Sequence, residues 1–381
     1  MFRKQISPKV TAVAVILILG LVQFAYWRLL VYEPEAPAAG GGGGGGPMST
    51  VPSVTGREDI EVRTFAGDSP GYRDGSLWEA RFCGPNALAL GADGSLYVAD
   101  SRNHRIRCIS PDRKVTTIAG GGTPDGAGGR ADGAAEAARF RFPSGVAVLP
   151  DGSLLIADTG NHRICRLTDG QVTTVAGGDA GKADGVGARA RFRSPGPITV
   201  DDNGITWIAD LGNGAVRRMD AAGVVSTPEA VPGGVTAALG EVARSSVPTP
   251  VLAAAEGRGM PAPTEYTLGR RSPGARLGDG AVLFADTEYG VLMVSQPGLG
   301  TWLAAGRRSD APPLKAVMDG SGMQAAFGLP CAAVQAPDGS VYVADYEASV
   351  IRQVQLPEWL RQGGEAPAAP RWGRRRMRRE R

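Results

Sequence analysis

Residues 140–178 read FRFPSGVAVLPDGSLLIADTGNHRICRLTDGQVTTVAGG, and this stretch decides the fold of the chain. It contains four short apolar runs, GVAVL, SLLIA, RICRL and VTTVA, which are separated by turn-forming residues such as Pro150-Asp151-Gly152. Apolar and β-branched residues in runs of this length are typical of strands on a half-buried surface. Four strands joined by tight turns predict an antiparallel sheet with two apolar faces, which neighbouring units must cover.

Four further units of the chain repeat this pattern. In all five units, including residues 140–178, the first run opens with a proline and the second run ends with Ala-Asp. The prolines are Pro85, Pro143, Pro195, Pro250 and Pro330, and the aspartates are Asp100, Asp158, Asp210, Asp286 and Asp345. The longer proline-to-aspartate spacing in the fourth unit predicts an insertion near residues 260–278, between its first and second strands. Without it the units recur about every 55 residues, which indicates an all-β fold of the β-propeller type.

The segments ADSRNHRIR (99–107) and ADTGNHRICR (157–166) resemble NHL repeats. The resemblance spans residues 60–356; it is strong in the first two units, fair in the third, and weak in the last two, where Tyr289-Gly290 and Ala348-Ser349 replace the Asn-His pair. The chain thus resembles a membrane-anchored NHL-repeat β-propeller protein of a bacterial type. The resemblance implies four-stranded blades, and it implies a role as an interaction platform.

Closure of the propeller can be predicted from the two ends of the repeat region. The last unit ends after a third strand, whereas EVRTFAG (61–67) matches the fourth-strand segments VTTIAG and VTTVAG. An N-terminal strand that completes the last blade removes an open sheet edge. This count predicts five blades within residues 59–356. Six blades would require the insertion to hide one.

Several repeated polar residues are expected to support the fold. The aspartate that ends each second strand can accept backbone N–H groups of the following turn. Aspartates in the blade-to-blade loops are expected to cap short helical turns, with cation binding as the alternative; they are Asp74, Asp132, Asp184 and Asp319. His104 and His162 are the only histidines, and we interpret them as surface or packing residues, so no metal site is predicted.

The N-terminal region predicts a membrane anchor. Residues 1–9 are basic, and residues 10–32 are apolar and long enough to span a bilayer, with aromatic residues at one end. The positive-inside rule then places the N-terminus in the cytoplasm and the propeller outside the inner cell membrane. A cleaved signal peptide is the alternative, because small residues follow at 36–40. Residues 33–58 form a Pro/Gly-rich flexible linker.

The charge of the chain is unevenly distributed. Both ends are basic, and residues 371–381 contain seven arginines, so the propeller between them is net acidic. This balance argues against nucleic acid as a partner. Residues 357–381 are predicted to be a disordered basic tail, which either associates with anionic lipids or is simply solvated.

Two sets of residues are candidates for binding a partner. The first set is arginines at the start of the innermost strands, which could bind carboxylate or phosphate groups unless they form a solvated rim; it comprises Arg81, Arg139, Arg141, Arg191 and Arg193. The second set lies in the insertion, which is either a partner surface or a tolerated excursion; it comprises Tyr266, Arg270 and Arg271. The partner is expected to be a protein or glycan of the cell envelope.

An enzyme is the alternative to a binding scaffold. Some propellers similar to this fold are lactonases or lyases with a metal site in the central channel. The innermost strands here contribute only Asn86, Asp201 and Gln335 as polar residues, which is a poor ligand set. We therefore predict no catalytic residue and no cofactor. The four cysteines show no CxxC motif. Closure of the ring makes Cys83 and Cys331 neighbours, but the demanding geometry of a disulfide argues against a bond between them.

Overall fold

We describe a computed structural model of the chain. The chain divides into two compact units, Met1–Pro52 and Ser53–Arg381, and every residue that the structure describes belongs to the second unit. The described residues are 60–121, 128–232, 235, 239, 274–277, 280–287, 289–296, 300–306 and 318–361. Within them, no helix has the length and apolar character that crossing a membrane requires. The predicted anchor (10–32), the linker (33–58) and all but the start of the predicted tail lie outside these residues.

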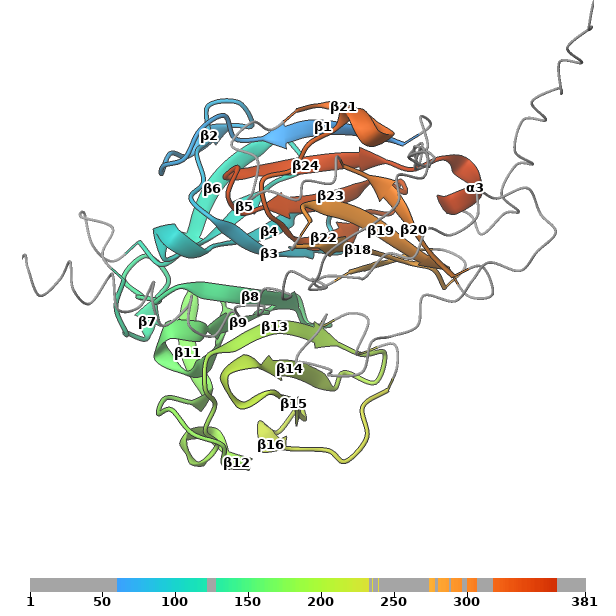
Figure 1. Cartoon of the computed structure of the whole chain (residues 1–381). Helices are drawn as coiled ribbons and strands as arrows, with labels where there is room; N and C mark the ends of the chain where they lie inside the picture. Colours follow the sequence, from blue (N-terminus) through green and yellow to red (C-terminus); the bar gives the residue numbers. More distant parts are fainter. Residues whose placement is uncertain are drawn as a thin grey trace, which may run out of the picture. The chain divides into compact units, whose positions relative to one another are not determined.

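The second unit is built from five antiparallel sheets, which confirms the predicted all-β propeller of five blades (Figure 1). The first blade comprises, from the innermost strand outward, β3 (Pro85–Leu90), β4 (Leu96–Asp100), β5 (Arg105–Ile109), β6 (Lys114–Ala119) and β2 (Gly75–Ser76). The second comprises β8 (Pro143–Val148), β9 (Leu154–Asp158), β10 (Arg163–Thr168), β11 (Gln171–Gly177) and β7 (Gly133–Ala134). The third comprises β13 (Pro195–Val200), β14 (Thr206–Asp210), β15 (Ala215–Met219), β16 (Val224–Ser226) and β12 (Gly185–Val186).

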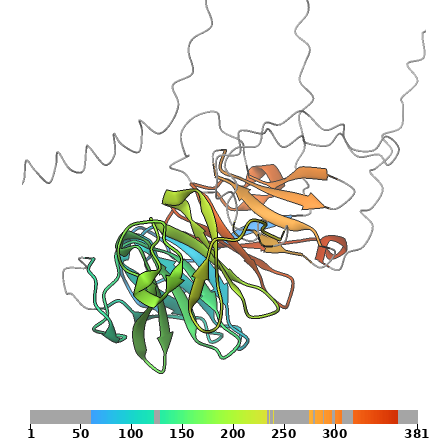
Figure 2. The same ribbon diagram turned by 90° about the horizontal axis from the view of Figure 1, so that it is seen from below.

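The last two blades complete the set. The fourth comprises β17 (Ala275–Arg276), β18 (Val282–Asp286), β19 (Val291–Gln296) and β20 (Gly300–Ala305). The fifth comprises β22 (Pro330–Gln335), β23 (Val341–Asp345), β24 (Val350–Gln355), β1 (Glu61–Ala66) and β21 (Gly320–Ser321), and the short helix α3 (Glu358–Arg361) follows it. Because β1 pairs antiparallel with β24, the N-terminal strand closes the last blade as predicted. Figure 2 shows the orange fourth sheet beside the orange-red fifth sheet.

Apolar side chains fill the seams between neighbouring blades. One phenylalanine is buried in each of four seams, next to strands of both blades, as the sequence predicted; these are Phe82, Phe140, Phe192 and Phe327. Between the second and third blades the innermost strands approach so closely that a Cβ on Gly145 would collide with the carbonyl oxygen of Gly196. Glycine at this position therefore allows the backbones of β8 and β13 to pack against each other.

The inner edge of the fourth blade differs from the prediction. From the sequence, the first strand of this blade was expected to begin at Pro250 and to cover residues 250–255, ahead of an insertion near 260–278. In the structure the strand that pairs with the inner side of β18 is β17, with Ala275 opposite Leu283. Leu277 and Gly280 then form the same turn that Gly91 and Gly94 form in the first blade. The inner strand thus falls within the predicted insertion, and residues 250–255 lie outside the described part.

Candidate functional site

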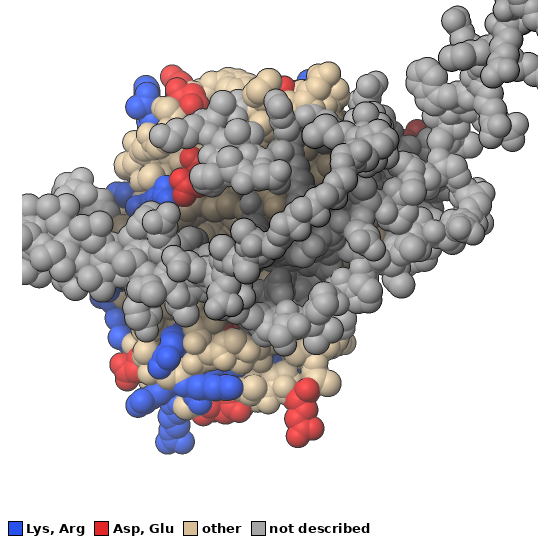
Figure 3. Space-filling model, in the orientation of Figure 1, with Lys and Arg blue, Asp and Glu red and all other residues tan. Residues whose placement is uncertain are grey.

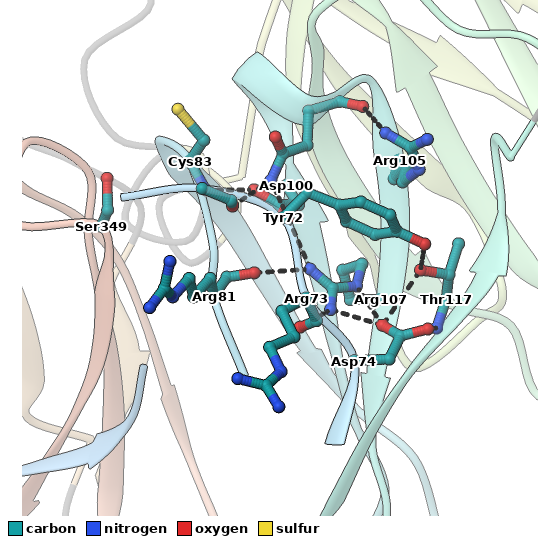
Figure 4. Close-up of polar contacts among 12 residues, drawn as sticks. Tyr72, Arg73, Asp74, Arg81, Cys83, Asp100, Arg105, Arg107, Thr117 and Ser349 are labelled. Carbon is teal, nitrogen blue, oxygen red and sulfur yellow. Dashed lines mark hydrogen bonds and ion pairs between the residues drawn. The ribbon is translucent and has the colours of Figure 1, made fainter. Parts of the chain in front are cut away.

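A buried arginine ties the first blade together (Figure 4). The Arg107 guanidinium is fully buried and donates to Asp100 (2.8 Å), Asp74 (2.5 Å) and the carbonyl oxygens of Arg81 (2.9 Å) and Arg73 (2.8 Å). A buried charge is tolerated only when it is paired and hydrogen-bonded, and these contacts supply both conditions. The arginine therefore holds the loop that leads into the blade against its middle strands.

The same arrangement recurs in three other blades. Arg217 bridges Asp210 and Asp184 in the third blade, and Arg352 bonds to Asp319 in the fifth. In the second blade the register position of Arg107 holds Cys165, and Arg163 from two residues earlier reaches Asp158 and Asp132 instead. The fourth blade carries Met293 at the equivalent position. Sequence reasoning missed these arginines, although a basic residue in four of the five third strands was the available signal.

The repeated aspartates thus have structural roles. Asp100 is buried and accepts the backbone N–H of Cys83 (2.7 Å), which precedes the first strand of the blade, whereas from the sequence the donor was expected in the turn that follows Asp100. Burial raises its pKa to about 6, although Arg107 opposes the shift. The loop aspartates do not cap helical turns as expected. Asp74 accepts the backbone N–H and the hydroxyl of Thr117 on the outermost strand, and Asp132 bonds to Thr174 in the same way.

This network fixes the backbone that carries the predicted binding arginines. The carbonyl oxygens of Arg139 and Arg191 accept hydrogen bonds from the buried Arg163 (3.0 Å) and Arg217 (2.9 Å). The backbone N–H groups of Arg141 and Arg193 donate to Asp158 and Asp210, each at 2.7 Å. All four side chains of Arg139, Arg141, Arg191 and Arg193 are exposed. Four exposed arginines are therefore carried on a fixed backbone just before the first strands of the second and third blades. We call these four residues the arginine face.

The exposed arginines differ in their partners. Arg81, at the equivalent position of the first blade, lies 3.6 Å from Asp68. In contrast, Arg141, Arg191 and Arg193 form no ion pair with any residue that the structure describes. Figure 3 shows basic side chains at the lower left, over the side where β7 and β12 lie in Figure 1. Four of the five predicted arginines thus lie at the start of two neighbouring blades, the second and the third, and Arg81 lies at the start of the first. The predicted Tyr266, Arg270 and Arg271 lie outside the described residues.

Two histidines join successive blades beside the arginine face. His104 accepts the backbone N–H of Phe142 at Nδ1 (3.0 Å), and His162 accepts that of Ser194 (3.0 Å). Both histidines adopt a left-handed conformation at the end of a short 3-10 turn. Between the fifth and first blades, the Ser349 hydroxyl accepts from Gly84 at the equivalent position (3.3 Å). The histidines are therefore packing residues, as interpreted from the sequence.

Stability is expected to depend on the protonation of these histidines. Burial and neighbouring arginines lower the pKa of His104 and His162 below the ordinary value of 6.5. The histidines of the unfolded chain therefore bind protons more readily than those of the folded protein. The contribution of His104 and His162 to the free energy of unfolding is complete above pH 6.5 and is lost as the pH falls below it. We expect the wild type to lose up to about 1 kcal/mol more than a His104→Asn/His162→Asn variant between pH 7.5 and 5, the scale of one solvent-screened hydrogen bond.

Urea denaturation of both proteins at a series of pH values measures this difference. Asparagine tolerates the left-handed conformation and retains an acceptor oxygen, so the variant is a matched control that does not titrate. An identical pH dependence in the two proteins would contradict the role of the histidines.

The described part of the central strands shows no catalytic constellation. No three His, Cys, Asp or Glu side chains among the described residues lie close enough to hold a metal ion. Asp201 follows β13 and bonds to the backbone of its own turn and to Trp207. The cysteines are free, and the Cys331 thiol lies 3.3 Å from the carbonyl oxygen of Pro85, so the Cys83–Cys331 disulfide is not formed.

Comparisons with known proteins agree with this architecture. The family model described as NHL repeat matches residues 82–109 and 140–167, which belong to the first two blades. The chloroplastic protein SUPPRESSOR OF QUENCHING 1 of Arabidopsis thaliana is 30% identical over 172 residues, which are 42% of this chain and 16% of the relative. NHL repeat-containing protein 2 of Bos taurus is 32% identical over 156 residues, 37% of this chain and 21% of the relative. The chain thus aligns with only about a fifth of these relatives' length.

The chain is also similar to solved structures, at low identity and with TM-scores below 0.5. An auxiliary nutrient binding protein of Bacteroides ovatus is 16% identical, with a TM-score of 0.46 over 79% of this chain and 78% of that chain. A virginiamycin B lyase of Staphylococcus aureus, in an inactive form with quinupristin, is 12% identical, with a TM-score of 0.41 over 72% of this chain and 80% of that chain. At such identities the likeness concerns the fold alone.

Proposed function

We propose that this NHL-repeat β-propeller is a binding scaffold that docks a protein partner on its arginine face. The observation that carries the proposal is a set of exposed guanidinium groups that find no counter-ion among the described residues, on a backbone held by buried ion pairs; these are Arg141, Arg191 and Arg193. Unpaired arginines on a rigid scaffold attract and orient a partner of opposite charge without a cost for ordering the loop.

The location of the protein is part of the same proposal. The apolar segment 10–32, preceded by basic residues, would tether the propeller to the inner cell membrane with the arginine face outside the cytoplasm. The linker 33–58 would allow the propeller to stand away from the bilayer. The partner is then a protein of the cell envelope.

No observation on the described residues favours the alternative of a lactonase- or lyase-like enzyme. The candidate polar residue Asp201 is held in a turn, and the described residues offer no group of metal ligands. The innermost strand β3 reads PNALAL, with Asn86 as its one polar side chain. The binding function is therefore the one we develop.

The test is cross-linking in intact cells with a full-length variant in which all four residues of the arginine face are replaced by glutamate. We expect the yield of the cross-linked partner to fall at least about tenfold, as for the loss of several central contacts of an interface. The control variant is Arg113→Glu/Lys114→Glu, in the turn at the other end of β5 from His104. Unchanged capture by the arginine-face variant would refute the docking function.

A further inference from the structure

We infer that the partner presents an extended acidic peptide segment, which places an apolar side chain on Phe142 and carboxylates on Arg141 and Arg193. The inference rests on the proposed function and names the chemistry that this face recognises. It comes from three features of the structure: an exposed aromatic residue in an unfavourable backbone conformation, two oriented arginines of which one precedes it and the other lies at the next seam, and the absence of both features at the equivalent place in the first blade.

Phe142 occupies a position that suits glycine. Its φ is 50°, and the equivalent residues of the first and third blades are Gly84 (φ 60°) and Ser194 (φ 50°). A bulky residue in the left-handed region is rare and strained, so its retention points to a use for the side chain. The ring is 45% exposed and packs edge-on against His104, with a centroid distance of 4.5 Å. The histidine thus holds an aromatic platform toward solvent.

The two arginines are aimed by glycines in the neighbouring turns. A Cβ on Gly160 would collide with the side chain of Arg141, and a Cβ on Gly212 with that of Arg193. The aliphatic parts of both arginines therefore lie flat across these turns. Arg141 lowers the pKa of both His104 and His162, and Arg193 lowers that of His162, so the cationic groups lie near both seams.

The equivalent surface of the first blade differs from that of the second and third blades. Cys83 and Gly84 replace the Arg-Phe pair, and the turn carries Arg102, whose guanidinium is already paired with Glu347 at 2.8 Å. Arg102 also stacks over the ring of Tyr346 at 4.4 Å. The guanidinium of Arg102 and the ring of Tyr346 thus already have interaction partners within the chain. At the seams of the second and third blades Phe142, Arg141 and Arg193 remain exposed to solvent.

The chemistry favours a carboxylate-bearing peptide over other polyanions. The planar guanidinium group pairs with a carboxylate through two parallel hydrogen bonds. Aromatic and arginine side chains together are typical of the centre of protein interfaces. An exposed aromatic ring next to Arg141, with Arg193 at the following seam, suits a segment that carries an apolar residue among acidic ones. A sulfated glycan or a lipid surface would use the cations but has less use for the aromatic ring.

The test uses a fluorescein-labelled decapeptide, two copies of Glu-Glu-Leu-Glu-Glu, titrated with the full-length protein in detergent micelles and followed by fluorescence anisotropy. We expect saturable binding at about 150 mM salt, weakened at least tenfold by Arg141→Glu/Arg193→Glu. Phe142→Gly is expected to weaken binding by a similar factor without lowering the thermal midpoint, because glycine relieves the left-handed strain. Arg81→Glu, whose arginine is already paired, is expected to change binding less than twofold.

Equal binding by the wild type and the double arginine variant would overturn the inference. So would binding of a heparin octasaccharide or of phosphatidylglycerol vesicles that depends on Arg141 and Arg193 when the decapeptide does not bind, because the recognised class would then be a glycan or a lipid. Cross-linking of the same double variant in cells separates the two proposals. Lost capture without decapeptide binding would leave the docking function in place, whereas unchanged capture would remove the docking function itself.

Discussion

Replacement of Arg217 by methionine is expected to lower the free energy of unfolding by about 3–5 kcal/mol, the usual cost of breaking one side of a buried ion pair. Arg217 and Asp210 are both fully buried and lie 2.9 Å apart. Without the guanidinium the Asp210 carboxylate keeps only the backbone N–H of Arg193 and the side-chain amide of Asn213 as hydrogen-bond donors. The carbonyl oxygen of Arg191 also loses its Arg217 donor, and that of Ala183 keeps only the backbone N–H of Arg191.

Guanidinium chloride denaturation of the wild type and the variant measures this effect. The control is Arg218→Met, a half-buried neighbour on the same strand whose side chain points to the other face of the sheet, and we expect a change below about 1 kcal/mol. A small effect of Arg217→Met would show that the buried ion pair contributes little to the blade.

The effect should extend to binding. Arg217 fixes the carbonyl oxygen of Arg191, so its loss frees the segment that carries Arg191 and Arg193. A variant that is destabilised but still folded at low temperature should therefore capture less partner, although it keeps every residue of the arginine face. Comparison of the two variants distinguishes the role of the buried network from that of the contact residues. Arg217→Met alters the network and keeps the contact residues, whereas the arginine-face variant does the reverse.

Much of the fold could be predicted because the blade is encoded locally. Each strand is a short apolar run, each turn has its own glycine or aspartate, and the unit is repeated, so one well-marked copy such as residues 140–178 assigns the others. The closing strand β1 was found in the same way. The fourth blade was misassigned because its inner strand, β17, contains only Ala275 and Arg276 and lacks an apolar run. In that blade the inner strand is identified by its backbone pairing with β18 and not by its residue pattern.

The candidate site was predicted only in part. The exposed arginines could be located, because they flank the buried phenylalanines at fixed positions, but which of them lack an intramolecular partner depends on side-chain packing. Arg163 is an example, because it pairs with Asp158 from a position two residues earlier in its strand than the one from which Arg107 pairs with Asp100. The backbone strain at Phe142 could not be predicted from the sequence either, because residue preferences do not indicate a positive φ for phenylalanine.

Replacement of Val62 by aspartate is expected to destabilise the propeller by at least about 4 kcal/mol, because it buries a carboxyl group in an apolar cluster. Val62 is the second residue of the closing strand, is fully buried, and lies opposite Val354 and Gly320. Its side chain belongs to the cluster that also contains Phe327 and Leu356. The strand joins the two ends of the repeat region, so its loss opens the edge of β24 and exposes both neighbouring seams.

Arg63→Asp is the matched control, because it places the same charge one residue further along the same strand. The Arg63 side chain is 64% exposed and its ion pair with Glu61 lies at the surface, so we expect a loss of no more than about 1 kcal/mol. Denaturation curves and limited proteolysis of the two variants compare them directly, and Val62→Asp should expose a cleavage site in the first seventy residues. Equal stability of the two variants would mean that the ring is closed without β1, and the blade would then have to be held by packing of the seams alone.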